Sequence, residues 1–255
     1  MTTPIAEDQL AAQILHSKSL PVSRTWLTNF LSTTNQRSVP LTATAQTALF
    51  RILSSDFRQT LSTRNTASLL PADITDPASK ERRVPGPVPV QVVDIEDIGA
   101  SIWSQVEAIE RVERGEAVRG REIVRTVNVD EDSEEREQNN TGNNAGSDAA
   151  RRDAGGGGSA GTHRVTLEDA AGTRVVAVEL KRVQELGIGK LAIGAKLLLK
   201  NATVARGLVL LTPECVAFLG GKIEHLDRGW KQSRKLRLLA RITEMDREEG
   251  GVATE

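Results

Sequence analysis

The sequence has few of the residues that build a large core or a reactive centre. Aromatic residues make up 3% of its 255 positions, tyrosine is absent, and the hydrophobic fraction is 38%. This composition predicts a modest core and a sizeable share of unstructured chain. The one cysteine excludes an internal disulfide framework, which fits a reducing compartment.

Long apolar runs are also missing. No run approaches the roughly 20 residues that a membrane-spanning helix needs, and the N-terminal MTTPIAEDQL has neither the basic nor the apolar region of a signal peptide. We therefore expect a soluble intracellular chain with no membrane partner. The net charge of −1 hides a segregated pattern, because residues 91–162 hold eight basic and sixteen acidic residues, whereas residues 163–245 hold fifteen and eight.

Patterns for catalysis, cofactors and metals are weak. GIGKLA at Gly187–Ala192 resembles a dinucleotide-binding turn, but a strand pattern follows it, so no helix N-terminus is available for a pyrophosphate. Cys215 and the three histidines lack metal-ligand spacing, and the acidic run DEDSEERE from Asp130 lacks the spacing of a calcium-binding loop. We expect no enzyme activity, cofactor, metal or small-molecule substrate. Cys215 is expected to be a buried apolar residue, and His225 to face solvent.

Three amphipathic stripes predict an N-terminal helical bundle over residues 1–69. The first stripe runs from Ile5 to Leu15, the second from Val22 to Leu31, and the third from Ala45 to Phe57. Trp26 and the three phenylalanines of this part are expected in its core. Residues 70–87, rich in proline and charge, predict an extended connector.

Short β-branched and leucine-rich segments predict a barrel over residues 88–245. VPVQVVDIEDIG predicts a strand from Val88 to about Asp94, and HRVTLEDAAGTRVVAVELK predicts a hairpin with strands at 163–168 and 173–180. Two further strands join near Arg206–Gly207, and CVAFLGG is a short last strand. Together they predict an α+β chain with a closed, antiparallel, five-stranded oligonucleotide/oligosaccharide-binding (OB) barrel. Pro213 is expected at a barrel corner, where its missing N–H is tolerated.

Residues 98–162 form an insertion between the first two barrel strands. The pattern from Ser101 to Arg111 indicates a short helix or an irregular return. Residues 130–161 are low-complexity and acidic. Such a segment buries too little apolar surface to offset its ordering entropy, so we expect disorder there.

The segment after Gly220–Gly221 predicts a C-terminal helix with Ile223, Leu226 and Trp230 on one face, followed by an acidic tail at 246–255. OB folds that grip single strands combine a basic groove with stacking rings, and Phe218 is the one aromatic residue between His163 and Leu226. We therefore expect only weak, charge-driven DNA binding. A stand-alone single-strand or junction-binding protein is the alternative function. The residues expected to contact DNA are Lys200, Arg206, Arg228, Lys231, Arg234 and Lys235.

Four stretches carry a resemblance to a known family: VPVQVVDIEDIGAS, VAVELK, IGAKLLLKNATVARGLVLLTPECVAFLGGKIEHL, and WLTNFL with RILSSDF. The third is the most specific, because it orders a G-x-K start, an R-G turn, a T-P-E corner and an L-G-G end. On these residues the chain resembles the RecQ-mediated genome instability protein 1 family in its short, single-barrel form. It departs from the family at IGAK, where a proline more often precedes the glycine.

The resemblance implies a non-catalytic nuclear subunit that binds topoisomerase III and a RecQ-family helicase. It also implies that the complex dissolves double Holliday junctions in DNA recombination and repair, and that the insertion reaches towards the topoisomerase. The apolar residues that flank the insertion's acidic run are the expected contacts. Lys196, which starts an alternating strand where the family also has a lysine, is expected at the barrel rim, and its loss should leave stability unchanged. The expected partner-binding residues are Ile102, Trp103, Val106, Val118, Ile123, Val124, Val127 and Lys196.

Overall fold

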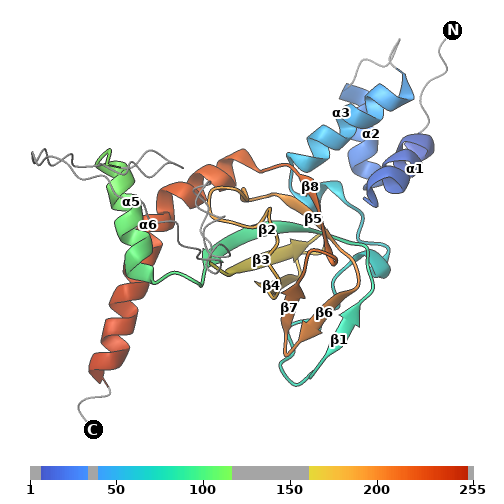
Figure 1. Ribbon diagram of the computed structural model, residues 1–255. Helices are drawn as coiled ribbons and strands as arrows, with labels where there is room; N and C mark the ends of the chain where they lie inside the picture. The colour runs from blue at the N-terminus through green and yellow to red at the C-terminus, as the bar shows by residue number, and fades with distance from the viewer. Residues whose placement is uncertain (1–6, 34–39, 117–160, 252–255) are drawn as a thin grey trace, which may run out of the picture.

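The computed structural model describes residues 7–33, 40–116 and 161–251. Its N-terminal helices share a hydrophobic core with Ala170 and Leu198 of the sheet and stand at one end of this curled sheet (Figure 1). The helices are α1 (Glu7–Lys18), α2 (Arg24–Thr33), α3 (Leu41–Leu53) and the short α4 (Phe57–Thr60), followed by a 3₁₀ turn at Thr66–Ser68. Each predicted stripe supplies buried residues to this core: Leu10, Ile14, Leu27, Phe30, Ile52 and Phe57.

One aromatic residue of this part departs from its expected place. Phe30 and Phe57 are buried, but Phe50 is 74% exposed, so the prediction that all three phenylalanines lie in the core is wrong. Trp26 is half-buried and stacks on Phe30 with ring centroids 5.3 Å apart. Phe50 lies on α3 beside the buried positions, where helical periodicity alone does not separate the core face from its edge.

The rest of the described chain contributes eight strands to a single sheet that curls into a half-barrel. Its order is β1-β6-β7-β4-β3-β2-β5-β8, and two residues, Lys200 and Asn201, join β5 to β6. Neighbouring strands pair antiparallel except β4 and β7, which are parallel. The strands are β1 (Arg82–Val84), β2 (Val88–Asp97), β3 (His163–Asp169), β4 (Arg174–Glu179), β5 (Lys196–Leu199), β6 (Ala202–Ala205), β7 (Leu208–Leu211) and β8 (Val216–Gly220).

The structure confirms the predicted hairpin, formed by β3 and β4. It corrects the predicted strand count, the all-antiparallel pairing and the closed barrel, because the sheet is open with β1 and β8 at its edges. The prediction missed β1, which lies inside the proline-rich connector and pairs with β6. It also placed a single strand before the Arg206–Gly207 turn, whereas the left-handed backbone at Asn201, with a φ of 49°, separates β5 from β6.

The half-barrel core follows from alternation along each strand. Val175 and Ala177 of β4 point inwards and are buried, as are Val209 and Leu211 of β7. Cys215 is 6% exposed and joins this core, as predicted, and Pro213 lies in the turn between β7 and β8.

Two glycines of the family-like stretch permit close approaches that a side chain would block. Gly194, with a φ of 82°, faces Ile223 so closely that a Cβ atom would lie 2.5 Å from it. Gly221, with a φ of 80°, lies against the carbonyl of Leu53, where a Cβ would approach to 2.3 Å. The first contact seats the start of the C-terminal helix on the half-barrel, and the second seats α3 beside the end of β8.

Two helices complete the half-barrel part of the chain. Helix α5 (Ile102–Glu113) follows β2, and helix α6 (Glu224–Gly251) follows β8 and crosses α5 (Figure 1). The segment left open as helix or irregular return is therefore a helix, and α6 continues into the part expected to be an acidic tail. His225 is exposed and Ile223 is buried, as predicted, whereas Leu226 is 43% exposed and so lies outside the expected apolar face.

Candidate partner-binding site

The insertion leaves and re-enters the sheet at one point. The backbone N–H of Ile98 donates to the carbonyl of Thr162 at 2.9 Å. A Cβ atom on Gly99 would lie 2.6 Å from the Cα of Gly161, so the two glycines touch. The chain between these ends can therefore change in length without moving β2 or β3 apart. The predicted disordered segment, 130–161, lies outside the described residues apart from Gly161.

Helix α5 forms the first, ordered part of the insertion. Ser101 caps it, since its Oγ accepts from the N–H of Ser104 at 3.1 Å. Asp97 Oδ1 accepts from the N–H groups of Gly99 and Ala100 and so shapes the turn before the helix. The buried Gln105 donates from Nε2 to the carbonyls of Asp97 and Ala100, at 3.0 and 3.1 Å. These bonds fix the direction in which α5 leaves the sheet.

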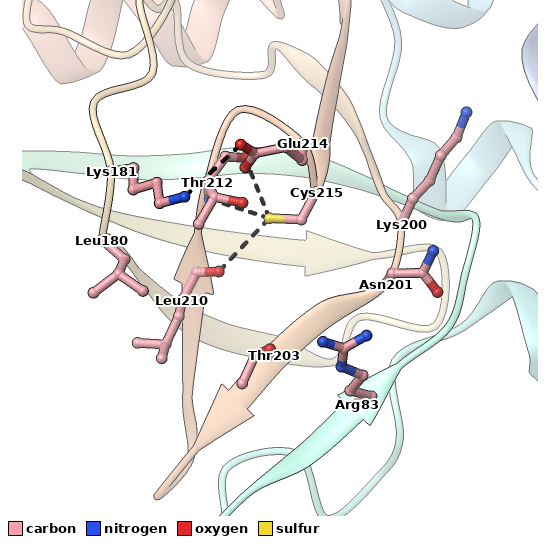
Figure 2. A pocket seen from close by; sticks show the side chains of 10 residues that line it. All are labelled: Arg83, Leu180, Lys181, Lys200, Asn201, Thr203, Leu210, Thr212, Glu214 and Cys215. Carbon is pink, nitrogen blue, oxygen red and sulfur yellow. Dashed lines mark hydrogen bonds and ion pairs between the residues drawn. The ribbon is translucent and has the colours of Figure 1, made fainter.

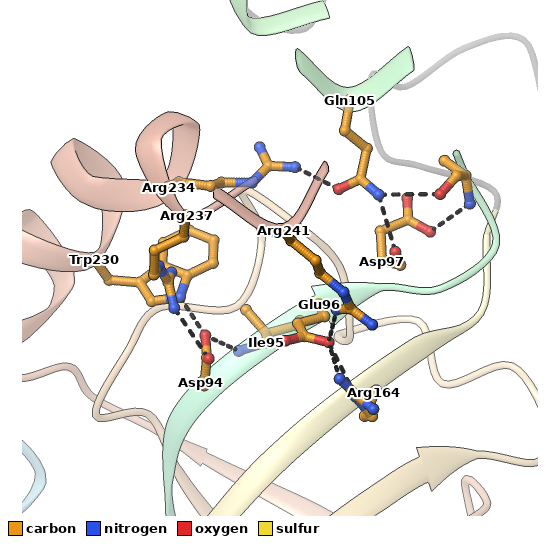
Figure 3. A network of polar contacts seen from close by, with 11 residues as sticks. Asp94, Ile95, Glu96, Asp97, Gln105, Arg164, Trp230, Arg234, Arg237 and Arg241 are labelled. Carbon is orange, nitrogen blue, oxygen red and sulfur yellow. Dashed lines mark hydrogen bonds and ion pairs between the residues drawn. The ribbon is translucent and has the colours of Figure 1, made fainter. Parts of the chain in front are cut away.

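Side chains of helix α6, most of them arginines, contact both α5 and β2 (Figure 3). On β2, Asp94 accepts from Trp230 Nε1 and pairs with Arg237 at 3.0 Å, while Glu96 accepts from Arg164 and Arg241. The Arg237 guanidinium also lies 5.3 Å from the centre of the Trp230 ring. Because Asp94 and Glu96 lie on the same face of β2, this strand holds α6 over about three helical turns, from Trp230 to Arg241.

The same helix holds α5 through two further cations. Arg234 donates to Gln105 Oε1 at 3.1 Å, and burial lowers the pKa of its guanidinium. Lys235 Nζ lies 2.7 Å from Glu113 and 3.3 Å from Glu110, and the hydrogen bond that Lys235 donates to Glu113 raises the pKa of the lysine. Lys235 of α6 and the two glutamates of α5, Glu110 and Glu113, therefore neutralise one another.

These pairs change the interpretation of the predicted DNA-binding residues. Of the four on α6, Arg228 lies 3.7 Å from Glu224 and Lys231 lies 2.5 Å from Asp227, and Arg234 and Lys235 face α5 as described. The sequence of α6 indicates a basic helix. Most of the carboxylates that neutralise it belong to β2 and α5, which are distant from α6 in the sequence. Lys200 and Arg206 are both exposed, and Arg206 donates to the carbonyl of Pro77 at 3.4 Å.

The predicted partner-binding residues of the insertion divide into three groups. Trp103 is 64% exposed and Ile102 is half-buried, so both reach the surface of α5. Val106 is 4% exposed and packs inwards, so the expectation that it is available to a partner is wrong. Two exposed apolar residues beside them were not predicted, Ile98 at 48% and Val112 at 43%. The others, Val118, Ile123, Val124 and Val127, lie outside the described residues.

Lys196 is not at the rim of the half-barrel, and the prediction that it is exposed is wrong. Its side chain is 0% exposed, with Nζ 2.9 Å from Gln91 Oε1 and 4.7 Å from the centre of the Phe57 ring. All four residues of β5 are buried because the half-barrel core covers one face and the helical domain, in contact with Leu198, covers the other. Alternation along β5 therefore failed to identify an exposed face.

Lys196 belongs to a polar row that crosses four strands. Strand register places Lys196 beside Gln91, Gln91 beside Glu168, and Glu168 beside Arg174. Gln91 Nε2 donates to Glu168 at 3.0 Å and to Asp56 at 2.8 Å, and Gln91 Oε1 also accepts from the N–H of Phe57 at 3.0 Å. The row thus bonds the helical domain to the sheet. Burial lowers the pKa of Lys196 to about 8, against the opposing attraction of Asp56 and Glu168.

Another buried polar pair was missed by sequence reasoning. His163 Nδ1 lies 3.0 Å from Glu179 Oε2, and both side chains are buried where the insertion returns to β3. Glu179 also accepts from the N–H groups of Val183 and His163, so the pair anchors the segments on both sides of the β3–β4 hairpin. Within residues 7–33, 40–116 and 161–251, no cluster of three or more histidine, cysteine, aspartate or glutamate side chains has the geometry to hold a metal ion. No helix in these ranges is long and apolar enough to span a membrane.

The N-terminal helices, the curled sheet and the connection after β2 define a protein with a helical domain and an OB-fold domain. Family models agree with this division: one described as "RMI1, N-terminal OB-fold domain" matches residues 70–234, and one described as "RMI1, N-terminal helical domain" matches residues 10–60. The chain belongs to the RMI1 family, and as such it is a non-catalytic complex subunit. It is similar to RecQ-mediated genome instability protein 1 of Schizosaccharomyces pombe, with 26% identity over 214 residues, which cover 84% of this chain and 87% of the relative.

Proposed function

We propose that the chain is a scaffold and regulatory subunit of a RecQ helicase–topoisomerase III complex in the nucleus. In this role it binds topoisomerase III and promotes decatenation and double Holliday junction dissolution during DNA recombination and repair. Family membership supports the proposal, as does the name of the fission yeast relative, which refers to RecQ and to genome instability. The half-barrel supplies a rigid support, and the insertion supplies the contact.

The observation that carries the proposal is the exposed Trp103 on a braced helix. Tryptophan is enriched among the residues that dominate binding energy in protein interfaces, and this one is 64% exposed on α5. The hydrogen bonds of Gln105 and the ion pairs of Lys235 fix α5 in the absence of any partner. A partner therefore does not have to order this helix, which lowers the entropy cost of binding.

The rest of the insertion is proposed to regulate the topoisomerase rather than to hold the fold together. Its ends meet at Gly99 and Gly161, and the entropy of closing a loop grows only slowly with its length. Replacing residues 117–160 with a short glycine–serine linker should leave the melting temperature unchanged. The variant should keep part of its topoisomerase III binding and lose most of its stimulation of decatenation. Unfolding of the variant, or full stimulation by it, would contradict this role.

We also propose that any DNA contact is auxiliary and rests on charge. The internal contacts of α6 argue against the stand-alone DNA-binding alternative, because Arg228, Lys231 and Lys235 each pair with a carboxylate and Arg234 donates to Gln105. Charge-driven binding falls steeply with salt. Affinity for single-stranded DNA that persists at high salt would contradict the auxiliary role and favour the alternative.

A further inference from the structure

The outward face of β4 and β7 carries a strip of aliphatic side chains. None of the described helices lies over these two strands (Figure 1). Strand register places Val176 beside Leu208 and Val178 beside Leu210, all on the face opposite the core. Leu208 is 40% exposed, and Leu180, just beyond β4, is 62% exposed. These five residues are called the aliphatic strip below. Val176, Val178 and Leu210 are half-buried. Contiguous apolar surface marks interaction sites more often than isolated apolar residues do.

A hollow of about 400 Å³ adjoins the strip and gives it a cationic flank (Figure 2). Register continues the outward row from Leu210 on β7 to Thr203 on β6 and to Arg83 on β1. Leu180 and Leu210 form one wall of the hollow, and Arg83 and Lys200 stand on the other side, with Thr203 between them. The hollow is therefore apolar on one side and positively charged on the other.

The cations of this hollow differ from those of α6. Among the described residues, neither Arg83 nor Lys200 forms an ion pair, whereas Lys181 lies 3.9 Å from Glu214. Glu214 is itself held by a hydrogen bond from Thr212, which lowers the pKa of its carboxyl group. The lining therefore holds three cations and one carboxylate, and the surplus positive charge is open to a ligand.

We propose that the aliphatic strip and the hollow bind an extended acidic segment of a partner protein. An aliphatic side chain of the segment packs on Leu180 and Leu210, and a carboxylate two residues away pairs with Arg83 and Lys200. Strands β7 and β1 are two strand spacings apart, about 10 Å, and an extended chain advances about 7 Å over two residues. The long side chains of Arg83 and Lys200 span the remainder.

The same observations argue against a nucleic acid as the ligand of this surface. None of the ten lining residues is aromatic, and single-stranded nucleic acids are held largely by stacking of bases on aromatic rings. Phosphates also gain nothing from the aliphatic strip. A carboxylate-bearing peptide thus replaces DNA as the ligand expected at Lys200. The site lies on strands other than β2 and β3, from which the insertion emerges, so it is independent of the topoisomerase-binding role.

The test uses the full chain and a fluorescein-labelled peptide in which leucine and aspartate alternate at every second position, with serine between them. In extended form this peptide carries leucine and aspartate on one face. Fluorescence polarisation should show saturable binding that Arg83→Glu with Lys200→Glu weakens by about tenfold or more, since two exposed ion pairs are replaced by repulsion. Leu180→Ser should weaken binding as well. Arg64→Glu with Lys190→Glu, a charge-matched change at exposed residues outside the hollow, should leave it unchanged.

Two probes separate the sources of binding: the same peptide with asparagine for aspartate, and a short oligothymidine. The neutral peptide should bind about tenfold more weakly than the acidic one, and the oligothymidine should not depend on Leu180. The proposal is overturned if the acidic peptide does not bind, if the neutral peptide binds equally well, or if the control pair weakens binding as much as the hollow pair. It is also overturned if oligothymidine binds more tightly than the peptide and loses affinity in the same variants. Unchanged melting curves verify that the variants are folded.

Discussion

Replacing Lys196 with methionine should change how the stability of the protein depends on pH. The lysine is fully buried beneath the helical domain, and methionine has a similar length without the charge. Gln91 Oε1 keeps an N–H donor in the variant, because it also accepts from Phe57 at 3.0 Å. The substitution therefore removes the buried charge without leaving that oxygen unpaired.

The magnitude follows from the lowered pKa. Lys196 has an ordinary pKa of 10.5 in the unfolded chain and about 8 in the folded protein. Between these values the unfolded state binds more protons, so the free energy of unfolding rises with pH. At about 1.36 kcal/mol per pH unit, the wild type should gain about 3 kcal/mol relative to Lys196→Met. The gain is complete above pH 10.5 and is lost as the pH falls to 8.

Urea denaturation at several pH values from 7 to 11 measures this difference, followed by tryptophan fluorescence. The absence of tyrosine helps, because no phenol ionises at alkaline pH. Other lysines titrate in both proteins, so their contributions cancel in the comparison. A difference between wild type and Lys196→Met that stays constant from pH 8 to 10.5 would show that the folded protein does not bury a lysine with a lowered pKa.

Two further substitutions test the packing around α6. Gly194→Ala should lower the free energy of unfolding by about 3 kcal/mol, because the new Cβ would lie 2.5 Å from Ile223 at a positive φ. Gly189→Ala is the control, since Gly189 has a similar φ of 87° with open space around it. An equal loss of stability in both variants would reject the steric explanation. Asp94→Ala should cost about 2 kcal/mol, since Trp230 and Arg237 both lose a charged acceptor, and an unchanged near-ultraviolet circular dichroism signal from the tryptophans would show that Asp94 does not hold the helix.

Local patterns predicted the parts of the fold that depend on local periodicity. The β3–β4 hairpin, the buried Cys215 and the turn at Pro213 all follow from alternation and turn chemistry over a few residues. The division between β5 and β6 was missed because one residue, Asn201, adopts a left-handed backbone that nothing in its neighbourhood signals. Strand β1 was missed because its partner, β6, lies more than a hundred residues further along the chain.

The site was less predictable because its side chains are defined by distant partners. Lys196 starts an alternating strand, and only the packing of the helical domain reveals that both faces of β5 are covered. The cations of α6 indicate a basic face until Asp94, Glu96 and the carboxylates of α5 are placed beside them. Trp103 was identified from its apolar character among charged neighbours, and the structure shows it exposed.

The central claim is that the insertion docks a topoisomerase through α5, and Trp103 tests it most directly. Co-purification of topoisomerase III with Trp103→Ser should be compared with Phe50→Ser, which removes another exposed aromatic ring, 74% exposed on α3. The Trp103 variant should bind at least about tenfold more weakly, as expected for an interface residue that contributes 1.4 kcal/mol or more, while the Phe50 variant binds like the wild type. Equal binding by the Trp103 variant and the wild type would contradict the claim.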